Sequence, residues 1–429
     1  MSHNPFLSDW VKGGANPSLS PPGSLSYVAG STDASLHFIT VSQLLDRTVA
    51  RHGSRDAAVF VAQNQRLSWY DLQQQADRMA AAMLAMGIRR GNRVGIWSPN
   101  RLEWLLTQFA TARIGAVLVN INPAYKSSEL EYALNTVRCR MLVMARAYKS
   151  NDYLDTLRQL APEIDRPGPA GDLTSLRLEH LKHVIVLDEL SLPAHEAAKQ
   201  PVPARAMRFK DFLQQAGPAQ HARLKDLSAA LDPDDAINIQ FTSGTTGNPK
   251  GATLSHFNIV NNARFAAKSM ALTHEDRMCI PVPLYHCFGM VLGVLTCTAA
   301  GAAMVFPGEG FDAAATLKAV LKQRCTALHG VPTMFVSMLA EPGVANMDFS
   351  LLRTGIMAGA PCPVDTMQAV MRTLNMKQIT IGYGMTETSP LSFQSHVSDP
   401  VERRVSTVGR IQPHVQAKVI DAHGRMVPV

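Results

Sequence analysis

The chain has 429 residues, 46% of them apolar, and its 41 basic and 34 acidic residues give a formal net charge of +7. About 150 residues per domain predicts two or three compact units, each able to bury a core. The basic residues are scattered, so we expect no nucleic-acid partner. The mild positive balance suits anionic substrates such as nucleotides or carboxylates, and equally an ordinary solvated surface.

The six cysteines form no C-x-x-C pair and have no regularly spaced histidine partner. Neither a zinc site nor a disulfide framework is therefore expected. The N-terminus has no basic start followed by an apolar run, so we predict no secretory signal. Thiols in a reducing cytoplasm are the expected state, and the protein is predicted to be cytoplasmic.

The first elements in chain order alternate between helix and strand patterns. Residues 1–35 are rich in Ser, Gly, Pro and Asn and predict a surface arm. A helix is predicted from Ser68, where a Ser-x-x-Asp capping box precedes a periodic apolar stretch that ends at Gly87. The runs RVGIW, AVLVNIN, RMLVMA and HVIVLDE follow, separated by helical or irregular stretches. This alternation predicts an α/β fold with largely parallel sheets flanked by helices.

The pattern weakens between residues 162 and 235, where we expect an approximate boundary between subdomains. Further on, residues 290–306 form an uncharged run of 17, at the short end of the length that spans a membrane. Gly301 divides the run and Pro307 closes it. A buried helix that leads into a central parallel strand is therefore preferred, and no transmembrane segment is expected.

The stretch FTSGTTGNPKG, residues 241–251, directly follows a β-rich run, INIQF. Ligands of open α/β sheets bind at such strand ends. Glycines allow close backbone approach, hydroxyls donate hydrogen bonds and Lys250 adds a positive charge, as a polyphosphate cradle requires. It is not a Walker loop, because Pro249 stands where that pattern has glycine. On composition alone, a merely flexible loop is an equal alternative.

Four motifs in order give the chain its resemblance to a known family. They are TSGTTGNPKG at 242–251, PLYH at 283–286, AGAP at 358–361 and YGMTET at 383–388. Together they resemble the adenylate-forming enzymes, which include acyl-CoA synthetases, luciferases and peptide-synthetase adenylation domains. The resemblance covers about residues 40–429. It implies two helix-flanked sheets and a smaller, barrel-like β-rich region, with 36–429 as the family's large N-terminal domain. The family's small C-terminal lid domain would then be missing, and the chain alone poorly active.

The resemblance also implies a reaction and a set of site residues. A carboxylate attacks the α-phosphorus of ATP, pyrophosphate leaves, and coenzyme A takes the acyl group, so the protein supplies positioning and charge. Glu387 would bind Mg²⁺, and Thr386 would contact the α-phosphate. Tyr383 would stack on adenine beside Gly384. The remaining nucleotide-binding residues implied are Thr242, Ser243, Gly244, Thr245, Thr246, Gly247 and Lys250 for the phosphates, and Gly359, Ala360 and Pro361 for the adenine slot.

His286 would lie beside the carboxylate of the acid, as a third catalytic residue. Peptide-synthetase domains offer an aspartate in this region to the substrate's ammonium group, whereas Tyr285-His286 offers no counter-ion. A plain carboxylic acid, of medium or long chain, is therefore the expected substrate. The expected acyl pocket is apolar and rich in methionine. Its candidates, each of which is equally a core residue, are Phe288, Met290, Val291, Val331, Met334 and Phe335.

The leading hypothesis is thus an acyl-CoA synthetase that uses ATP, Mg²⁺ and coenzyme A. An amino-acid or acyl-carrier adenylation domain and a non-catalytic nucleotide-binding module are the alternatives. The sequence leaves a homodimer open.

Overall fold

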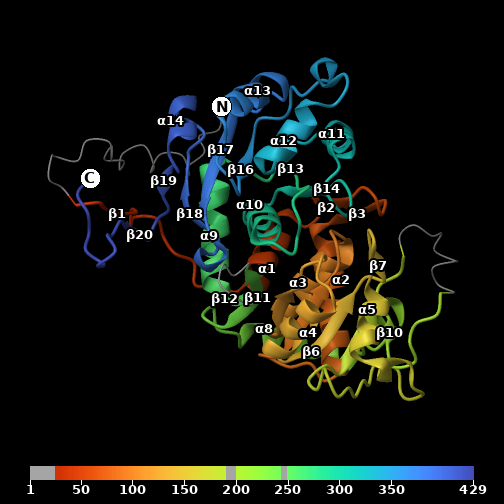
Figure 1. Ribbon diagram of the computed structural model, residues 1–429. Helices are drawn as coiled ribbons and strands as arrows, with labels where there is room; N and C mark the ends of the chain where they lie inside the picture. The colour runs from red at the N-terminus through yellow and green to blue at the C-terminus, as the bar shows by residue number, and fades with distance from the viewer. Residues whose placement is uncertain (1–24, 190–199, 243–248) are drawn as a thin grey trace.

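The computed structural model describes residues 25–189, 200–242 and 249–429. Two large sheets dominate this part of the protein, and each has parallel strands at its centre (Figure 1). The α/β architecture predicted from the alternating pattern is therefore confirmed.

The first sheet has seven strands in the order β10-β9-β6-β4-β5-β11-β12. All neighbours pair in parallel except β11 and β12, which form an antiparallel hairpin at one edge. The runs RVGIW, AVLVNIN and INIQF fall on β4, β5 and β11. The strands are β4 (Arg93–Trp97), β5 (Val117–Asn120), β6 (Cys139–Met144), β9 (His183–Val186), β10 (Met207–Arg208), β11 (Ala236–Thr242) and β12 (Lys250–Ser255).

The second sheet has nine strands in the order β19-β18-β17-β16-β15-β13-β14-β2-β3. Its six central strands, from β17 to β2, pair in parallel. Figure 1 shows the early strands β2 and β3 beside β14, so the chain leaves this sheet and returns to it after building the other. The strands are β2 (Asp56–Phe60), β3 (Gln65–Ser68), β13 (Arg277–Cys279), β14 (Ala303–Phe306), β15 (Ala327–Leu328), β16 (Thr354–Ala358), β17 (Gln378–Gly384), β18 (Leu391–Gln394) and β19 (Arg410–Ile411).

Helices cover both faces of each sheet and divide the interior into three cores. The largest core is shared by the two sheets and the helices between them, α1, α2, α3, α9 and α10. A second core lies under α4 and α5, and a third lies under α11, α12 and α13. The helices are α1 (Val41–His52), α2 (Trp69–Ala85), α3 (Leu102–Ile114), α4 (Ser127–Thr136), α5 (Tyr153–Leu160), α7 (Phe209–Leu213), α8 (Pro218–Ala229), α9 (His256–Ser269), α10 (Thr296–Ala300), α11 (Ala313–Lys322), α12 (Pro332–Leu339), α13 (Val364–Thr373) and α14 (Val401–Ser406).

Helix α2 begins where its capping box predicts. Ser68 Oγ accepts a hydrogen bond from the Asp71 backbone N–H at 3.1 Å, and the Asp71 carboxylate accepts the Ser68 backbone N–H at 2.9 Å. The Ser68 hydroxyl also donates to the Asp71 carboxylate at 2.6 Å, and this bond, together with the one from the Ser68 backbone N–H, holds the pKa of the Asp71 carboxyl below its usual value. The helix stops before Gly87, which adopts the left-handed conformation with φ 80°.

The uncharged run at 290–306 is buried except at the partly exposed Ala299 and Ala300, and it leads into a strand of the nine-stranded sheet, as the sequence predicts. It lies on a π-helix, η3 (Phe288–Leu295), on α10 and on the central strand β14. Among the helices in the described parts of the chain, none combines the length and apolar character that crossing a bilayer requires.

The smaller β-rich region joins segments from the two ends of the chain. β1 (Tyr27–Ala29) pairs antiparallel with β20 (Gln416–Lys418), and isolated bridges extend the contact at Leu25–Pro428 and Ile420–Met426. Figure 1 shows this pair standing to the left of the nine-stranded sheet. Residues 1–24 of the predicted arm lie outside the described residues.

Candidate functional site

The predicted phosphate-binding loop joins β11 to β12. Thr242 ends β11 and Lys250 begins β12, and the two residues are register partners across the hairpin. The Thr242 hydroxyl lies 3.5 Å from Glu387 Oε1, a residue 145 positions later. Lys250, Thr242 and Glu387 therefore meet at one place. Five predicted members of the loop lie outside the described residues, namely Ser243, Gly244, Thr245, Thr246 and Gly247.

Glu387 is carried by a short 3₁₀ helix, η5 (Thr386–Thr388), which packs against β12. The Thr388 hydroxyl caps this turn by accepting the Met385 backbone N–H at 3.1 Å. Thr386 is buried, with 8% of its surface exposed, whereas the Glu387 side chain is exposed. Gly384 makes the turn possible, because a Cβ there would lie 1.9 Å from the Pro390 carbonyl oxygen. The carboxylate is thus presented to solvent from a fixed backbone.

The residues predicted to bind adenine lie at the C-terminal ends of two neighbouring strands. β16 and β17 run in parallel with Ala358 opposite Gly382, so Gly359 just after β16 and Tyr383 near the end of β17 lie at the same end of the two strands. The Tyr383 side chain is 51% exposed, and its ring meets Phe393 edge-on at 6.0 Å. One face of a half-exposed ring beside a glycine-containing bend can accept a planar base. Ala360 and Pro361 are exposed on the same bend.

His286 lies in the loop that follows β13, with its ring accessible to solvent. Its Nδ1 accepts the Phe288 backbone N–H at 3.1 Å. Protein surrounds the ring on most sides, and this partial burial lowers the pKa of the imidazole. The neutral ring therefore carries its proton on Nε2, which can donate a hydrogen bond to a carboxylate oxygen.

Cys287 links this histidine to the threonine of the 3₁₀ turn. Its buried sulfur lies 3.5 Å from His286 Nδ1 and 3.7 Å from Thr386 Oγ1. Burial raises the pKa of the thiol to about 11, so the group stays protonated and can donate to either neighbour. The structure thus brings His286, Thr386 and Glu387 into one neighbourhood.

The predicted acyl-pocket residues lie in two different cores. Phe288, Met290 and Val291 are buried on η3 in the large central core, and the partly buried Val331 and Met334 pack against it. Phe335 belongs instead to the core under α11–α13, with 0% of its surface exposed. Val331 also borders the predicted adenine site, since a Cβ on Gly359 would lie 3.3 Å from its side chain. Their role in binding an acyl chain stays a prediction.

Sequence reasoning missed a set of buried amides behind His286. Asn120, Asn238 and Gln240 are at most 3% exposed and bond to one another and to the loop that carries His286. An asparagine within AVLVNIN shows no spacing that marks it. The only available signal was a polar residue at the end of an apolar strand.

A magnesium ion fits the groups found around Glu387. An exposed carboxylate and a hydroxyl are hard oxygen donors, and Mg²⁺ typically takes one or two carboxylates together with water and substrate phosphates. Within residues 25–189, 200–242 and 249–429, no three His, Cys, Asp or Glu side chains form a cluster that could hold a metal ion. A site completed by phosphate oxygens is consistent with this arrangement.

Comparison with known proteins shows the family. The profile of the AMP-binding enzymes matches residues 45–429. The chain is 44% identical to the medium-chain acyl-CoA ligase ACSF2 of zebrafish (Danio rerio), a mitochondrial protein, over 96% of this chain and 67% of that one. It is 41% identical to the acyl-CoA ligase sidI of Aspergillus fumigatus, over 95% of this chain and 66% of that one. The chain thus spans about two thirds of the length of these relatives.

The fold agrees with a solved structure as well. A long-chain-fatty-acid-CoA ligase, FadD1, from Archaeoglobus fulgidus superposes with a TM-score of 0.74 at 20% identity, over 94% of this chain and 75% of that one. At this identity the match supports the architecture only. Family profile, sequence identity and fold agree, and the chain therefore belongs to the AMP-binding enzyme family, among its AMP-forming acyl-CoA ligases.

Proposed function

We propose that this protein activates a fatty acid of medium chain length with ATP and transfers the acyl group to coenzyme A. The observation that carries the proposal is the meeting of Lys250, Thr242 and Glu387 at the strand end next to His286 and Thr386. The medium chain length is taken from the name of the zebrafish relative. The long-chain acids of the initial hypothesis are the alternative substrates.

Each residue would serve one part of the transition state. Lys250 and the loop of residues 242–247 would hold the departing β- and γ-phosphates, and Thr386 would donate to the α-phosphate. Mg²⁺ held by Glu387 would neutralise the charge that develops on the phosphates. His286 Nε2–H would orient the attacking carboxylate. Gly359, Ala360, Pro361 and Tyr383 would enclose adenine. Catalysis would thus come from position and charge, with no nucleophile on the protein.

Pyrophosphate exchange tests the proposal. The protein should exchange labelled pyrophosphate into ATP only when a fatty acid is present, and octanoate should support exchange better than amino acids. Exchange that depends on an amino acid would favour an amino-acid adenylation domain instead. Calorimetry with ATP addresses the non-catalytic alternative, because a folded protein that binds nucleotide without exchange under any acid would be a binding module.

The acyl acceptor and the cellular compartment are also proposals. The relatives' names support coenzyme A, and a carrier protein is the alternative acceptor. All six cysteines are free thiols, which fits a reducing compartment, and the cytoplasm is the compartment proposed.

A further inference from the structure

The loop that carries His286 is held by side-chain amides. Residues 280–286 follow β13 without joining a strand. The side chain of Asn100, which is 4% exposed, forms two hydrogen bonds with the backbone of the first part of this loop. Its Nδ2 donates to the Val282 carbonyl at 3.0 Å, and its Oδ1 accepts the Leu284 N–H at 2.7 Å. The part before Tyr285 is therefore anchored independently of any other amide.

Asn120 holds the residue directly before His286. It ends strand β5, and its Nδ2 donates to the Tyr285 carbonyl oxygen at 2.9 Å. That oxygen belongs to the peptide plane that also contains the His286 nitrogen, because a peptide unit is planar. Fixing the Tyr285 carbonyl therefore also fixes the direction of the N–Cα bond of His286, from which its side chain projects. The His286 N–H itself donates to the Pro283 carbonyl at 3.2 Å.

A chain of amides fixes the direction in which Asn120 points. The Gln240 amide group donates to Asn238 Oδ1 at 2.8 Å, and the Asn238 amide group donates to Asn120 Oδ1 at 2.9 Å. With its oxygen occupied in this way, Asn120 has to turn its NH₂ group toward Tyr285. Asn238, Gln240 and Thr242 occupy every second position of β11, so their side chains lie on the same face of the strand. This face extends from the buried amides to the predicted phosphate-binding loop.

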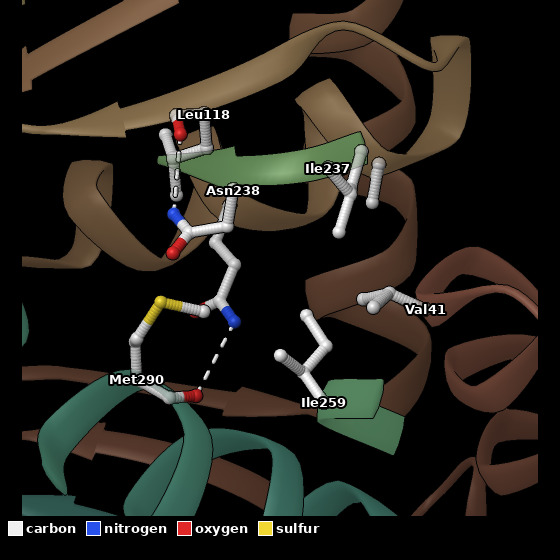
Figure 2. A pocket seen from close by; sticks show the side chains of 8 residues that line it. Val41, Leu118, Ile237, Asn238, Ile259 and Met290 are labelled. Carbon is white, nitrogen blue, oxygen red and sulfur yellow. Dashed lines mark hydrogen bonds between the residues drawn. The ribbon is translucent and has the colours of Figure 1, made fainter. Parts of the chain in front are cut away.

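The surroundings of Asn238 are apolar apart from the amide of Gln108, which donates to the Met290 carbonyl oxygen at 3.3 Å. Figure 2 shows Asn238 among Ile237, Ile259, Val41 and Met290, with its amide nitrogen bonded to the Leu118 carbonyl at 3.1 Å. The cavity that these residues line has a volume of only about 10 Å³, so Asn238 is close to fully packed. Amides in such a place are costly unless their hydrogen bonds are satisfied, and a satisfied network fixes one geometry.

We propose that Asn120 is a positioning residue for His286, and that Asn238 and Gln240 orient Asn120 for this role. By holding the Tyr285 peptide plane, Asn120 keeps Nδ1 of His286 under the Phe288 N–H and directs Nε2–H toward the carboxylate of the acid. The inference rests on the proposed function, in which His286 meets that carboxylate. It predicts that loss of the Asn120 contact raises the KM for the fatty acid and leaves the KM for ATP unchanged.

The substitution Asn120→Asp tests this with little change of shape. An aspartate can still accept the Asn238 N–H but, once ionised, cannot donate to Tyr285. Losing one oriented hydrogen bond in a buried site weakens binding by about tenfold. In octanoate-dependent pyrophosphate exchange we therefore expect the KM for octanoate to rise by about tenfold or more. The KM for ATP should change by less than about twofold, since the nucleotide groups are held by other elements.

Asn261→Asp is the matched control. Asn261 is also 4% exposed, its Nδ2 donates to the His37 carbonyl at 3.0 Å and its Oδ1 accepts the His37 N–H at 2.8 Å. Those contacts join α9 to the segment before α1, away from the His286 loop. In this variant the KM for octanoate should stay at the wild-type value.

Nitrogen NMR of the imidazole gives a second readout that does not need activity. The wild-type His286 ring should show the Nε2–H tautomer near pH 7, and Gln240→Met should broaden or shift its signals while the protein stays folded. A wild-type ring protonated on Nδ1 would overturn the inference, as would a folded Asn120→Asp protein with unchanged KM for octanoate. A wild-type protein with no acid-dependent exchange would instead contradict the proposed function.

Discussion

Glu387 and Thr242 come from opposite sides of the interface between the two sheets, and their side chains meet at 3.5 Å. Thr242 is fixed by β11, whereas Glu387 is fixed by the capped turn η5. Neither side chain contributes to a core, since one is half-buried and the other exposed. A change at Glu387 should therefore alter chemistry without altering the fold.

We expect Glu387→Gln to lower the rate of acid-dependent pyrophosphate exchange by on the order of 100-fold, because an amide is a poor ligand for Mg²⁺ and carries no charge. Its thermal unfolding should stay within about 1 °C of wild type, as is usual for exposed positions. Raising the Mg²⁺ concentration should restore part of the rate. Glu179→Gln, at another exposed glutamate, is the control and should leave the rate unchanged. Equal rates for both variants would contradict the metal role.

At the scale of elements, the π-helix η3 begins directly after the His286 loop and packs against it. A Cβ on Gly289 would lie 2.3 Å from the Pro283 carbonyl oxygen and 2.9 Å from Leu284 Cα. The same carbonyl accepts the His286 N–H. The close approach of η3 to the loop therefore depends on a glycine at this position, because the backbone of Pro283 and Leu284 leaves no room for a methyl group.

Gly289→Ala should thus destabilise the protein by about 1–3 kcal/mol, a typical cost of overpacking, and should lower octanoate-dependent exchange more than Gly293→Ala. Gly293 lies on the same helix, but a Cβ there would meet only the Ile280 side chain at 3.0 Å, and a side chain can move. Thermal unfolding and exchange rates measured side by side would check this. If the two alanine variants behave alike, the loop does not depend on the contact at Gly289.

The elements that the sequence predicts well are those with local signals. Helix α2 has a capping box at its start and a glycine after its end, and β4 and β11 are short β-rich runs bounded by turn residues. η3 could not be identified as a π-helix, because a stretch that is apolar on every side shows no period. Asn120 and Cys287 were missed for a related reason, since their partners are distant in sequence and only the assembled sheets bring them together.

At the scale of the whole molecule, two fully buried histidines join separate elements of the large central core. His256 Nδ1 accepts the Val41 N–H at 3.0 Å, and its Nε2 has no partner within the described part of the chain. His329 accepts the Ile356 N–H at 3.1 Å and lies 2.9 Å from the Leu292 carbonyl oxygen. Burial lowers the pKa of each from 6.5 to about 4.

This predicts a loss of stability in mild acid. Between pH 6.5 and pH 4 the unfolded chain binds protons that the folded protein excludes, so the free energy of unfolding falls as the pH falls through this range. At pH 5 the loss amounts to about 2 kcal/mol per histidine relative to neutral pH. Carboxyl groups contribute little at that pH, because their usual pKa values lie near 4.

Urea unfolding at pH 7 and pH 5 measures the difference in the free energy of unfolding. His256→Asn, whose amide oxygen can still accept the Val41 N–H but does not titrate, should reduce this difference by about 2 kcal/mol. An unfolding free energy equal at the two pH values would show that the folded protein admits these protons, by opening between the sheets or by hydrating the rings.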